Sequence, residues 1–512
     1  MHMFRKLIRG LFNRNTLFIL LLLFQAVFLV MTVLFLSKHY IEVAAGLIAL
    51  NMILAVYISN TDENPSYKMP WFLMMSFFPL CTGLAYVLVK TDIGHRMFKK
   101  NYARRVGETK KYLPQKKQII QQIREKSTVN AHLAEYLAEY GGYPVYRNYE
   151  SEYFPLGEQM FEAMKREIQK AKRYIFLEYF IIDKGVMWEA LLELLKEKAA
   201  RGIDVRLMYD GFGTQFIMPM QYFQKLQQYG IQCRVFNGFK PFLTSSQNNR
   251  DHRKILVIDG HTAFTGGINI ADEYINQKVR FGHWKDGGVL CRGEAAWSFT
   301  VMFLQLWHLE ETDNGELEEY RWTETFPANH DGFVQPYSDS PTDGESVGRN
   351  VYLDIINNAQ DYVYIMTPYL VLDHELITAL ELAAKKGVDV RLMMPHIPDK
   401  WYVYAIAWSY YQELLAKHVR IYEYLPGFVH AKNFSSDDRI AVSGTINMDY
   451  RSLYLHFECA AVFYQSQTVL EIKNDFIQSL EKCKEITLED CQKRPLGKRI
   501  VSGILRLFAP LM

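Results

Sequence analysis

Two segments of the chain carry the same polar residue types at the same offsets. The first contains His252, Lys254, Asp259 and Asn269, and the second contains His430, Lys432, Asp437 and Asn447. In each copy the order is His-x-Lys-(x)4-Asp, with an Asn seventeen residues after the His and small residues just before that Asn. Two copies at matching offsets predict a duplicated unit whose polar side chains converge on one site.

The paired histidines and lysines suit the chemistry of a phosphodiester. A lysine ammonium stabilises non-bridging oxygens, while an imidazole that titrates near neutrality attacks phosphorus or transfers a proton. Two facing pairs supply one nucleophile and one general acid, and the two Asn, with Gly267 and Thr445 just before them, are predicted to bind the phosphoryl oxygens. Neither motif offers a recognisable set of metal ligands beyond the histidines, so we expect a covalent phosphoryl transfer without metal or cofactor.

A predicted strand orients the residues of the first motif. The apolar run Ile255–Ile258 is typical of a buried strand, so His252 and Lys254, two residues apart, point to the same face at roughly 6.6 Å. Asp259 has the opposite parity and should face away from the histidine. We therefore include Asp259, and Asp437 at the matching offset, as structural partners of the catalytic set rather than direct reactants.

The second motif differs from the first in one respect. The lysine is followed by Asn433–Ser436, which is more polar than Ile255–Ile258 in the first copy. This composition predicts a strand that is less buried or nearer to a sheet edge. The catalytic residue types themselves are unchanged.

A second trace of duplication lies outside the motifs. The sequence Gly-Ile-Asp-Val-Arg-Leu-Met at 202–208 recurs as Gly-Val-Asp-Val-Arg-Leu-Met at 387–393, 185 residues later. From about residue 153 onward, strands alternate with helices, which favours two mostly parallel or mixed sheets with helices outside. The further predicted elements are strands 174–182 and 362–369 and helices 158–170, 190–201 and 376–386.

Three apolar stretches occupy the N-terminal region, at residues 17–36, 43–58 and 71–89. The first is long enough to cross a bilayer and has no cleavage site after it. The third contains Pro79 and Gly83, so we expect it to be kinked or re-entrant. Basic residues flank both ends of the region, which requires an even number of crossings if both flanks are cytoplasmic.

We therefore favour two full spans plus a partial segment, with the catalytic body in the cytoplasm; three full spans would place that body outside. The six cysteines show no paired framework, which fits a reducing compartment. At the other end, residues 498–512 combine basic and apolar residues and predict an amphipathic helix docked on the membrane surface rather than buried. Two aromatic segments, 239–243 and 401–411, suit either core packing or contact with lipid.

Several of these segments together resemble the phospholipase D superfamily and, within it, the bacterial cardiolipin synthases. The resemblance covers nearly the whole chain and rests on Asn248–Lys254, Gly266–Asn269, Ala271–Tyr274, Thr367–Tyr369, Pro426–Lys432 and Gly444–Leu453. It implies an α/β fold of two phospholipase D-like αβα sandwich halves, related by pseudo-twofold duplication and preceded by an N-terminal transmembrane helical region. The implied divisions are a membrane region (1–100), a basic linker (101–150), the first half (151–325), a connector (326–344), the second half (345–485) and a basic amphipathic tail (486–512).

The resemblance also implies an activity. One histidine attacks the phosphodiester of phosphatidylglycerol, glycerol leaves, and a second phosphatidylglycerol resolves the phosphatidyl-histidine to give cardiolipin. It implies His252 as nucleophile and His430 as general acid, although the roles are exchangeable, and Asp286 and Glu458 as the carboxylates that orient the histidines. The implied partners are phosphatidylglycerol and an anionic phospholipid bilayer, while the oligomeric state stays open.

Two other classes of enzyme use the same residue types. A membrane phospholipase D would pass the phosphatidyl group to water, and a related transferase would pass it to another alcohol, so the motifs alone do not separate them. A nuclease is disfavoured, because a formal net charge of +2 and apolar N-terminal stretches do not provide the broad basic surface that a phosphate backbone needs.

Overall fold

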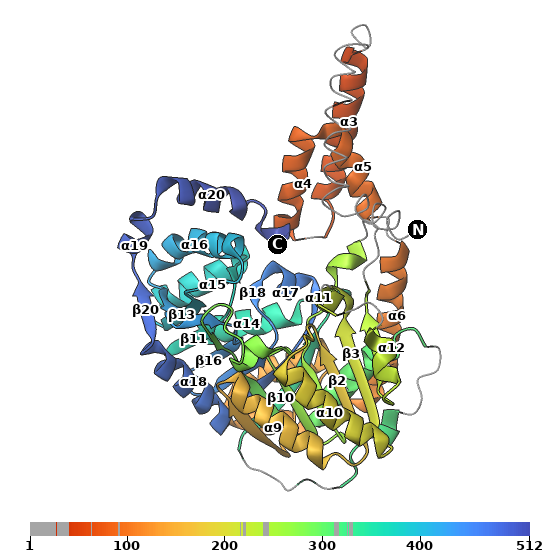
Figure 1. Ribbon diagram of the computed structural model, residues 1–512. Coiled ribbons are helices and arrows are strands. Elements are labelled where there is room, and N and C mark those ends of the chain that lie inside the picture. Colours follow the sequence, from red (N-terminus) through yellow and green to blue (C-terminus); the bar gives the residue numbers. More distant parts are fainter. Residues whose placement is uncertain are drawn as a thin grey trace. The chain divides into compact units, whose positions relative to one another are not determined.

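The computed structural model describes residues 27, 40–62, 64–90, 93–215, 217–218, 222–238, 245–311, 317–324, 326 and 331–511. The chain divides into two compact units. The first comprises residues 1–98, 239–249 and 507–512, and the second comprises residues 99–238 and 250–506. Both sequence motifs belong to the second unit, in which the first half runs from yellow to green and the second half from cyan to blue (Figure 1).

Helices form the described part of the first unit. They are α3 (Tyr40–Ser59), α4 (Pro65–Phe77) and α5 (Pro79–Lys90). The predicted kink in the third apolar stretch is a complete break between α4 and α5. Phe78 leaves the helical conformation, with φ −134° and ψ 60°, because the residue before a proline is disfavoured in the helical region.

No helix among the described residues is both long and apolar enough to cross a bilayer. The first predicted span, 17–36, lies outside those residues apart from Val27, and so does the aromatic segment 239–243. In the described helices, Ile58, Met75 and Tyr86 form a small buried cluster that joins α3, α4 and α5.

The predicted linker 101–150 is folded, contrary to the sequence interpretation. It contains the end of α6 (Ile93–Thr109), followed by α7 (Lys117–Lys126) and α8 (Thr128–Glu139). The sequence interpretation gave weight to the many lysines and arginines and missed an apolar stripe on α7. The residues of this stripe, Ile119, Ile120 and Ile123, are buried. An amphipathic helix needs only one such stripe to pack against a body.

The first half is built on a seven-stranded sheet with the order β1-β9-β7-β6-β2-β3-β4. Its strands are β1 (Tyr149–Phe154), β2 (Tyr174–Tyr179), β3 (Asp204–Asp210), β4 (Gln232–Phe236), β6 (Ile255–Ile258), β7 (Thr262–Gly266) and β9 (Gly288–Gly293). Strands β2, β3 and β4 are parallel to one another, while β6 is antiparallel to β2. The helix α10 (Val186–Ala200) connects β2 to β3, as the sequence predicted.

The second half repeats this order in a larger sheet, β10-β19-β17-β16-β11-β13-β14-β20. Its strands are β10 (Phe333–Asp339), β11 (Tyr362–Met366), β13 (Asp389–Pro395), β14 (Arg420–Tyr424), β16 (Asn433–Ser436), β17 (Ile440–Gly444), β19 (His456–Tyr464) and β20 (Cys483–Ile486). Each strand except the added edge strand β20 has a counterpart in the first sheet. The helix α15 (His374–Lys385) takes the place of α10.

Strand β16 corrects the expectation drawn from its polar sequence. It lies between β11 and β17, away from the sheet edges, and all four of its residues are buried. Asn433 is accommodated by a hydrogen bond from its amide to the hydroxyl of Tyr153, 2.9 Å away in the first half. Burial in the contact between the halves, rather than exposure, accounts for the polar side chain.

The predicted connector 326–344 is also corrected. Residues 333–339 form β10, which pairs with β19 over seven residues, from Phe333 opposite Tyr464 to Asp339 opposite Glu458. The polar residues of the segment suggested a connector, but all seven residues of β10 are buried.

The amphipathic tail forms a helix, α20 (Leu496–Arg506), which packs against the aromatic helix α16 (Trp401–Leu415). Arg506 makes an ion pair with Glu413 of α16 at 2.8 Å. Core packing accounts for one face of α16, where six residues are buried: Ala405, Ile406, Ala407, Tyr410, Tyr411 and Leu414.

Candidate active site

His252 of the first half is positioned by a short strand that pairs with the second half. Strand β5 (Arg250–Asp251) runs parallel to the start of β19, with Arg250 opposite His456. The backbone N–H of His252 then donates to the carbonyl of Phe457 at 2.9 Å. This register brings Nδ1 of His252 to 2.9 and 3.0 Å from the two carboxylate oxygens of Glu458.

His430 is held in the reciprocal way. Strand β15 (Gly427–Val429) of the second half pairs with β8 (His283–Lys285) of the first. The backbone N–H of His430 donates to the carbonyl of Lys285 at 2.7 Å, and its Nδ1 lies 2.6 Å from Oδ2 of Asp286. Each histidine is therefore oriented by a carboxylate from the opposite half, an exchange that the sequence analysis did not foresee.

The two lysines lie beside the histidines in the same buried region. Nζ of Lys254 donates to the carbonyl of His252 at 2.6 Å, and Nζ of Lys432 lies 2.9 Å from Nδ1 of His430. Each lysine is 1% exposed, and the histidines are 7% and 6% exposed. The charges of Lys432 and His430 both act on His252, so the histidines and lysines of the two motifs share one site.

Burial depresses the pKa of all four basic groups, and repulsion from neighbouring positive charges adds to the effect at His252, His430 and Lys432. The pKa of Lys254 falls to about 8 and that of Lys432 to about 7, in both cases chiefly because burial disfavours the charged form. Burial, followed by the charge of Lys432, lowers the pKa of His430 to about 4. The pKa of His252 lies well below its usual value for the same reasons, with Lys254 as the leading charge.

Both imidazoles are therefore neutral near pH 7. In each ring Nδ1 faces a carboxylate, and an Nδ1–H donated to that carboxylate leaves the lone pair on Nε2. A neutral imidazole with a free Nε2 is the form that can attack phosphorus. The geometry thus prepares a nucleophile before any substrate is present.

The two orienting carboxylates differ in charge state. Burial raises the pKa of Asp286, but His430, Lys432 and the N–H of Gly287 outweigh it, so the net pKa is lowered. Burial raises the pKa of Glu458 well above its usual value, with Lys254 opposing the shift. Asp286 is therefore a charged partner of its histidine, whereas Glu458 resists ionisation.

The two predicted phosphate-binding asparagines lie in different surroundings. Asn269 is engaged within the protein, because its Oδ1 accepts from the backbone N–H of Ile181 at 3.1 Å and its amide donates to Tyr274 at 2.7 Å. The Oδ1 of Asn447 is buried without a hydrogen-bond partner in the described residues. Of the two, Asn447 retains more unused capacity to bind a ligand.

Gly267 and Thr445, which were predicted to bind substrate, lie against the two carboxylates. A Cβ on Gly267 would lie 2.1 Å from Oδ1 of Asp286, so no side chain fits between this backbone and the carboxylate. At the equivalent position, the hydroxyl of Thr445 donates to Oε2 of Glu458. Both residues thus lie behind the carboxylates that orient the histidines.

Asp259 and Asp437 are not brought to the histidines. The carboxylate of Asp259 accepts from the backbone N–H groups of residues 172–174, at 2.7 to 2.9 Å. Asp437 accepts from those of residues 360–362, each at 2.9 Å. Each aspartate fastens the end of its motif strand to the start of the neighbouring strand, which is the structural role expected from its parity.

A buried ionic network behind His252 was missed by the sequence analysis. Arg253 is fully buried, and its Nε donates to Glu178 at 2.5 Å and lies 3.5 Å from Asp251. Asp210 accepts from the backbone N–H of Asp251 at 3.1 Å. The signal was present in the sequence, because Glu178 interrupts a strand that was predicted to be buried, and a buried acid requires a partner.

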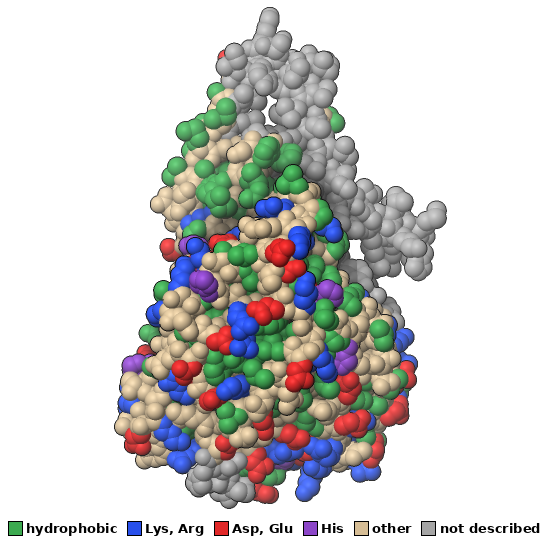
Figure 2. Space-filling model, turned by 90° about the vertical axis from the view of Figure 1, so that its left-hand side faces the viewer, with side chains coloured by type: hydrophobic (Ala, Val, Ile, Leu, Met, Phe, Trp, Pro, Cys, Tyr) green, Lys and Arg blue, Asp and Glu red, His purple; other side chains and the backbone are tan. Residues whose placement is uncertain are grey.

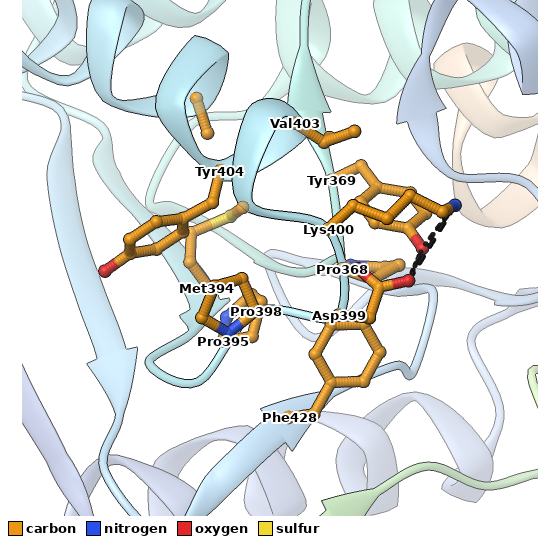
Figure 3. A pocket seen from close by; sticks show the side chains of 11 residues that line it. Pro368, Tyr369, Met394, Pro395, Pro398, Asp399, Lys400, Val403, Tyr404 and Phe428 are labelled. Carbon is orange, nitrogen blue, oxygen red and sulfur yellow. Dashed lines mark hydrogen bonds and ion pairs between the residues drawn. The ribbon is translucent and has the colours of Figure 1, made fainter. Parts of the chain in front are cut away.

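A small pocket lies beside the second motif (Figure 3). Its wall includes Phe428, whose ring centroid lies 5.7 Å from that of His430, together with Tyr369. Figure 3 shows the Tyr369 hydroxyl joined to Asp399, at 2.6 Å, with Lys400 alongside. Neither His252 nor His430 lines this pocket, so the pocket lies beside the two-histidine site rather than within it.

Three side chains could in principle approach a metal ion. The ligand atoms of His252, His456 and Glu458 lie within 4.8 Å of one another. However, Lys254 and Arg250 are among the cationic groups that act on His456, and a positive environment disfavours a further cation. We therefore derive no catalytic step through a metal.

Two sheets of equivalent strand order, each contributing a buried histidine and lysine to one centre, define a protein of the phospholipase D type. Comparison with solved structures supports the fold. Phosphatidylserine synthase of Haemophilus influenzae aligns with a TM-score of 0.53 at 16% identity, covering 70% of this chain and 93% of that one.

Sequence comparisons identify the family within this class. The family model described as cardiolipin synthase, PLD-like domain matches residues 164–280 and 352–480. A cardiolipin synthase of Geobacillus sp. (strain WCH70) is 34% identical over 464 residues, covering 90% of this chain and 91% of that protein. An uncharacterised protein of Streptococcus mutans serotype c is 45% identical over 457 residues, covering 89% of this chain and 99% of its own length. The chain belongs to the cardiolipin synthase family.

Proposed function

We propose that this enzyme joins two phosphatidylglycerol molecules into cardiolipin and glycerol through a phosphatidyl-histidine intermediate. The observation that carries the proposal is the reciprocal arrangement of the two motifs. Each buried, neutral imidazole is held through Nδ1 by a carboxylate from the other half, with a buried lysine beside it. Membership in the cardiolipin synthase family supports the choice of substrate.

In the first half-reaction, Nε2 of His252 attacks the phosphorus of phosphatidylglycerol. The bond between phosphorus and the headgroup oxygen breaks, and His430 gives a proton to the departing glycerol. The lysines stabilise the negative charge on the non-bridging oxygens. In the second half-reaction, the hydroxyl of another phosphatidylglycerol gives its proton to His430, its oxygen attacks phosphorus, and the P–N bond breaks.

His430 must carry a proton on Nε2 to act as the acid, although its pKa in the free enzyme is about 4. An incoming phosphate supplies negative charge near Lys432, whose positive charge is a major cause of the depressed pKa. Substrate binding should therefore raise the pKa of His430 and charge it when the proton is needed. The charged carboxylate of Asp286 favours the same change.

The surroundings of the two histidines support the assignment of roles. His252 faces Glu458, whose raised pKa provides little charge to stabilise an imidazolium. His430 faces Asp286, whose lowered pKa keeps it ionised. An imidazolium is thus better supported at His430, which favours His430 as the acid and His252 as the nucleophile.

We also propose that the enzyme acts at an anionic membrane on the cytoplasmic face, anchored through its N-terminal region. Residues 17–36 supply the predicted first crossing, and the basic flanks favour an even number of crossings in total. The helix α3 supports contact with lipid, because six large apolar side chains on it are 49% to 67% exposed: Ile48, Leu50, Met52, Ile53, Val56 and Tyr57.

The helix α20 is proposed as a second contact with the membrane surface. Its residues Leu496, Ile500 and Ile504, four apart along one face, are 70%, 53% and 54% exposed. Lys498 and Arg499 add positive charge, which attracts anionic lipid by about 1 kcal/mol per residue.

Hydrolysis of phospholipid is the main alternative, because water can resolve the same intermediate.

Nucleic acid is a less suitable substrate. Figure 2 shows basic side chains interspersed with acidic ones over much of the face drawn, rather than gathered in a broad basic region. Phosphate-backbone binding depends on such a region.

Reconstitution in vesicles of phosphatidylglycerol alone, followed by mass spectrometry of the lipids, tests the proposed function. Cardiolipin and glycerol in equal amounts are expected. Phosphatidic acid as the main product would replace the proposal with hydrolysis. The same assay with a chelator should leave the rate unchanged, and a loss reversed by added divalent ion would contradict the metal-free mechanism.

A further inference from the structure

A third histidine lies at the reaction centre without a hydrogen-bonding role inside the protein. The side chain of His456 is 10% exposed, and both ring nitrogens are buried with no hydrogen-bond partner in the described residues; Oε1 of Glu458 lies 3.6 Å from Nδ1, beyond hydrogen-bond distance. Its ring centroid lies 5.4 Å from that of His252. Leaving two buried polar atoms unpaired is costly, so such a group points to a ligand that is absent here.

The duplicated fold shows what the equivalent position holds in the other half. His456 lies opposite Arg250 in the β5·β19 pairing, and Trp284 lies opposite Phe428 in the β8·β15 pairing. The ring centroids of Trp284 and His430 lie 5.4 Å apart, which is also the distance between the ring centroids of His456 and His252. Tryptophan can only donate one hydrogen bond, whereas histidine adds an acceptor, so the two positions offer different chemistry.

The charge around His456 determines its protonation state. Burial and then the positive charges of Arg451, Lys254, Arg250 and Lys400 lower the pKa of His456 well below its usual value. The ring is therefore neutral, with one N–H donor and one nitrogen acceptor. An alcohol hydroxyl can donate one hydrogen bond and accept others, so two hydroxyl groups can satisfy the two nitrogens of the ring, whereas a metal cation would meet the surrounding positive charge.

We propose that His456 binds the hydroxyl groups of the glycerol headgroup beside His252, and thereby places the acceptor alcohol rather than water against the phosphatidyl-histidine. This inference rests on the proposed function. A bound hydroxyl has an effective concentration far above that of a free solute, which lets a lipid alcohol compete with water. His456 would thus act on the choice of acceptor more than on formation of the intermediate.

Replacing His456 by Phe tests this proposal with phosphatidylglycerol vesicles. Cardiolipin formation should fall about tenfold or more, because the unpaired hydroxyl loses its hydrogen bonds. Phosphatidic acid should rise as a share of the products, while the burst of phosphatidyl-enzyme in a rapid-quench experiment stays near the wild-type amplitude. A merely structural role would lower both products and the burst together.

Two further variants keep the test decisive. His456→Asn retains a donor and an acceptor and should recover most of the wild-type ratio of cardiolipin to phosphatidic acid. Trp284→Phe changes the equivalent position beside His430 and should leave that ratio unchanged, whatever its effect on rate. If His456→Phe does not fold, the His456→Asn ratio is compared with that of His456→Gln, which places the donor and acceptor one methylene farther out and should form more phosphatidic acid.

The outcomes separate this inference from the proposed function. Wild-type enzyme that makes no cardiolipin overturns the function itself. Wild-type enzyme that makes cardiolipin, together with a His456→Phe variant of unchanged product ratio, overturns only the role of His456. Activity of wild-type enzyme that is lost on chelation and restored by Zn²⁺, but is insensitive to both in His456→Phe, would replace the hydroxyl site with a metal site.

Discussion

The two halves place their histidines in equivalent backbone settings but in different chemical surroundings. Next to the first motif histidine, Arg250 pairs with His456 across the halves. Next to the second, Phe428 pairs with Trp284. One side of the centre is therefore polar and cationic, and the other is aromatic.

This difference shows how a duplicated site can acquire two functions. The strand register fixes the positions of both imidazoles, so position alone does not distinguish them. Burial raises the pKa of Glu458 despite the charge of Lys254, whereas His430 and Lys432 outweigh burial and lower the pKa of Asp286. Because the two carboxylates end in different charge states, we expect the two histidines to differ in role.

Removing either histidine should have the largest effect and should show which one is the nucleophile. His252→Asn and His430→Asn are each expected to lower kcat by about 1000-fold or more, since a nucleophile or acid is lost. In rapid-quench experiments with labelled phosphatidylglycerol, His430→Asn should retain an acid-labile label on His252, and His252→Asn should retain none. Label on His430 in the His252→Asn enzyme would reverse the assignment.

Neutralising the carboxylates should give a smaller and unequal effect. Asp286→Asn removes a charged partner of His430 and should lower kcat by about 100-fold or more. Glu458→Gln removes a group that already resists ionisation, so a loss nearer tenfold is expected. Steady-state kinetics of the two variants compares them directly, and a greater loss at Glu458 would contradict the different charge states.

The two lysines should produce a pH dependence in the alkaline direction. The pKa of Lys432 is about 7 and that of Lys254 about 8, so the free enzyme loses positive charge as pH rises through these values. The value of kcat/KM, which reports the free enzyme, should fall over the same interval. Lys432→Arg keeps its charge and should remove the decline near pH 7, and an unchanged profile would assign that decline to another group.

The smallest expected effect concerns Asn269. Tyr274→Phe removes the hydroxyl that accepts from Asn269, and it should lower the free energy of unfolding by about 1 kcal/mol. Chemical denaturation of detergent-solubilised enzyme measures the change, with activity largely retained. A large loss of activity at unchanged stability would instead place the Tyr274 hydroxyl in contact with substrate.

Much of this arrangement could be predicted from local patterns in the sequence. The apolar run Ile255–Ile258 predicted β6. The repeated sequence Asp-Val-Arg-Leu-Met predicted that β3 and β13 occupy equivalent places in the two halves. The parity of Asp259 gave its position away from His252. These features depend on residues within a few positions of one another, where side-chain alternation along a strand decides the outcome.

The rest depended on contacts between distant segments. The exchange of carboxylates follows from pairing Arg250 with His456, about two hundred positions later, and no local pattern records that register. The strand Asn433–Ser436 was predicted to be less buried or nearer to a sheet edge, because the hydrogen-bond partner of Asn433, Tyr153, lies in the other half and is not evident from the local sequence. The basic residues of α7 likewise led to a linker being predicted, although three isoleucines form an apolar face that is buried.

The exchange of short strands between the halves also bears on how the enzyme is synthesised. A growing chain that has completed β6 and β9 already carries Asp286, but the imidazole of His252 still lacks the carboxylate of Glu458. That partner is synthesised 206 residues after His252. A chain terminated before Glu458 would therefore carry His252 without the carboxylate that orients it, and its two-histidine site would be incomplete.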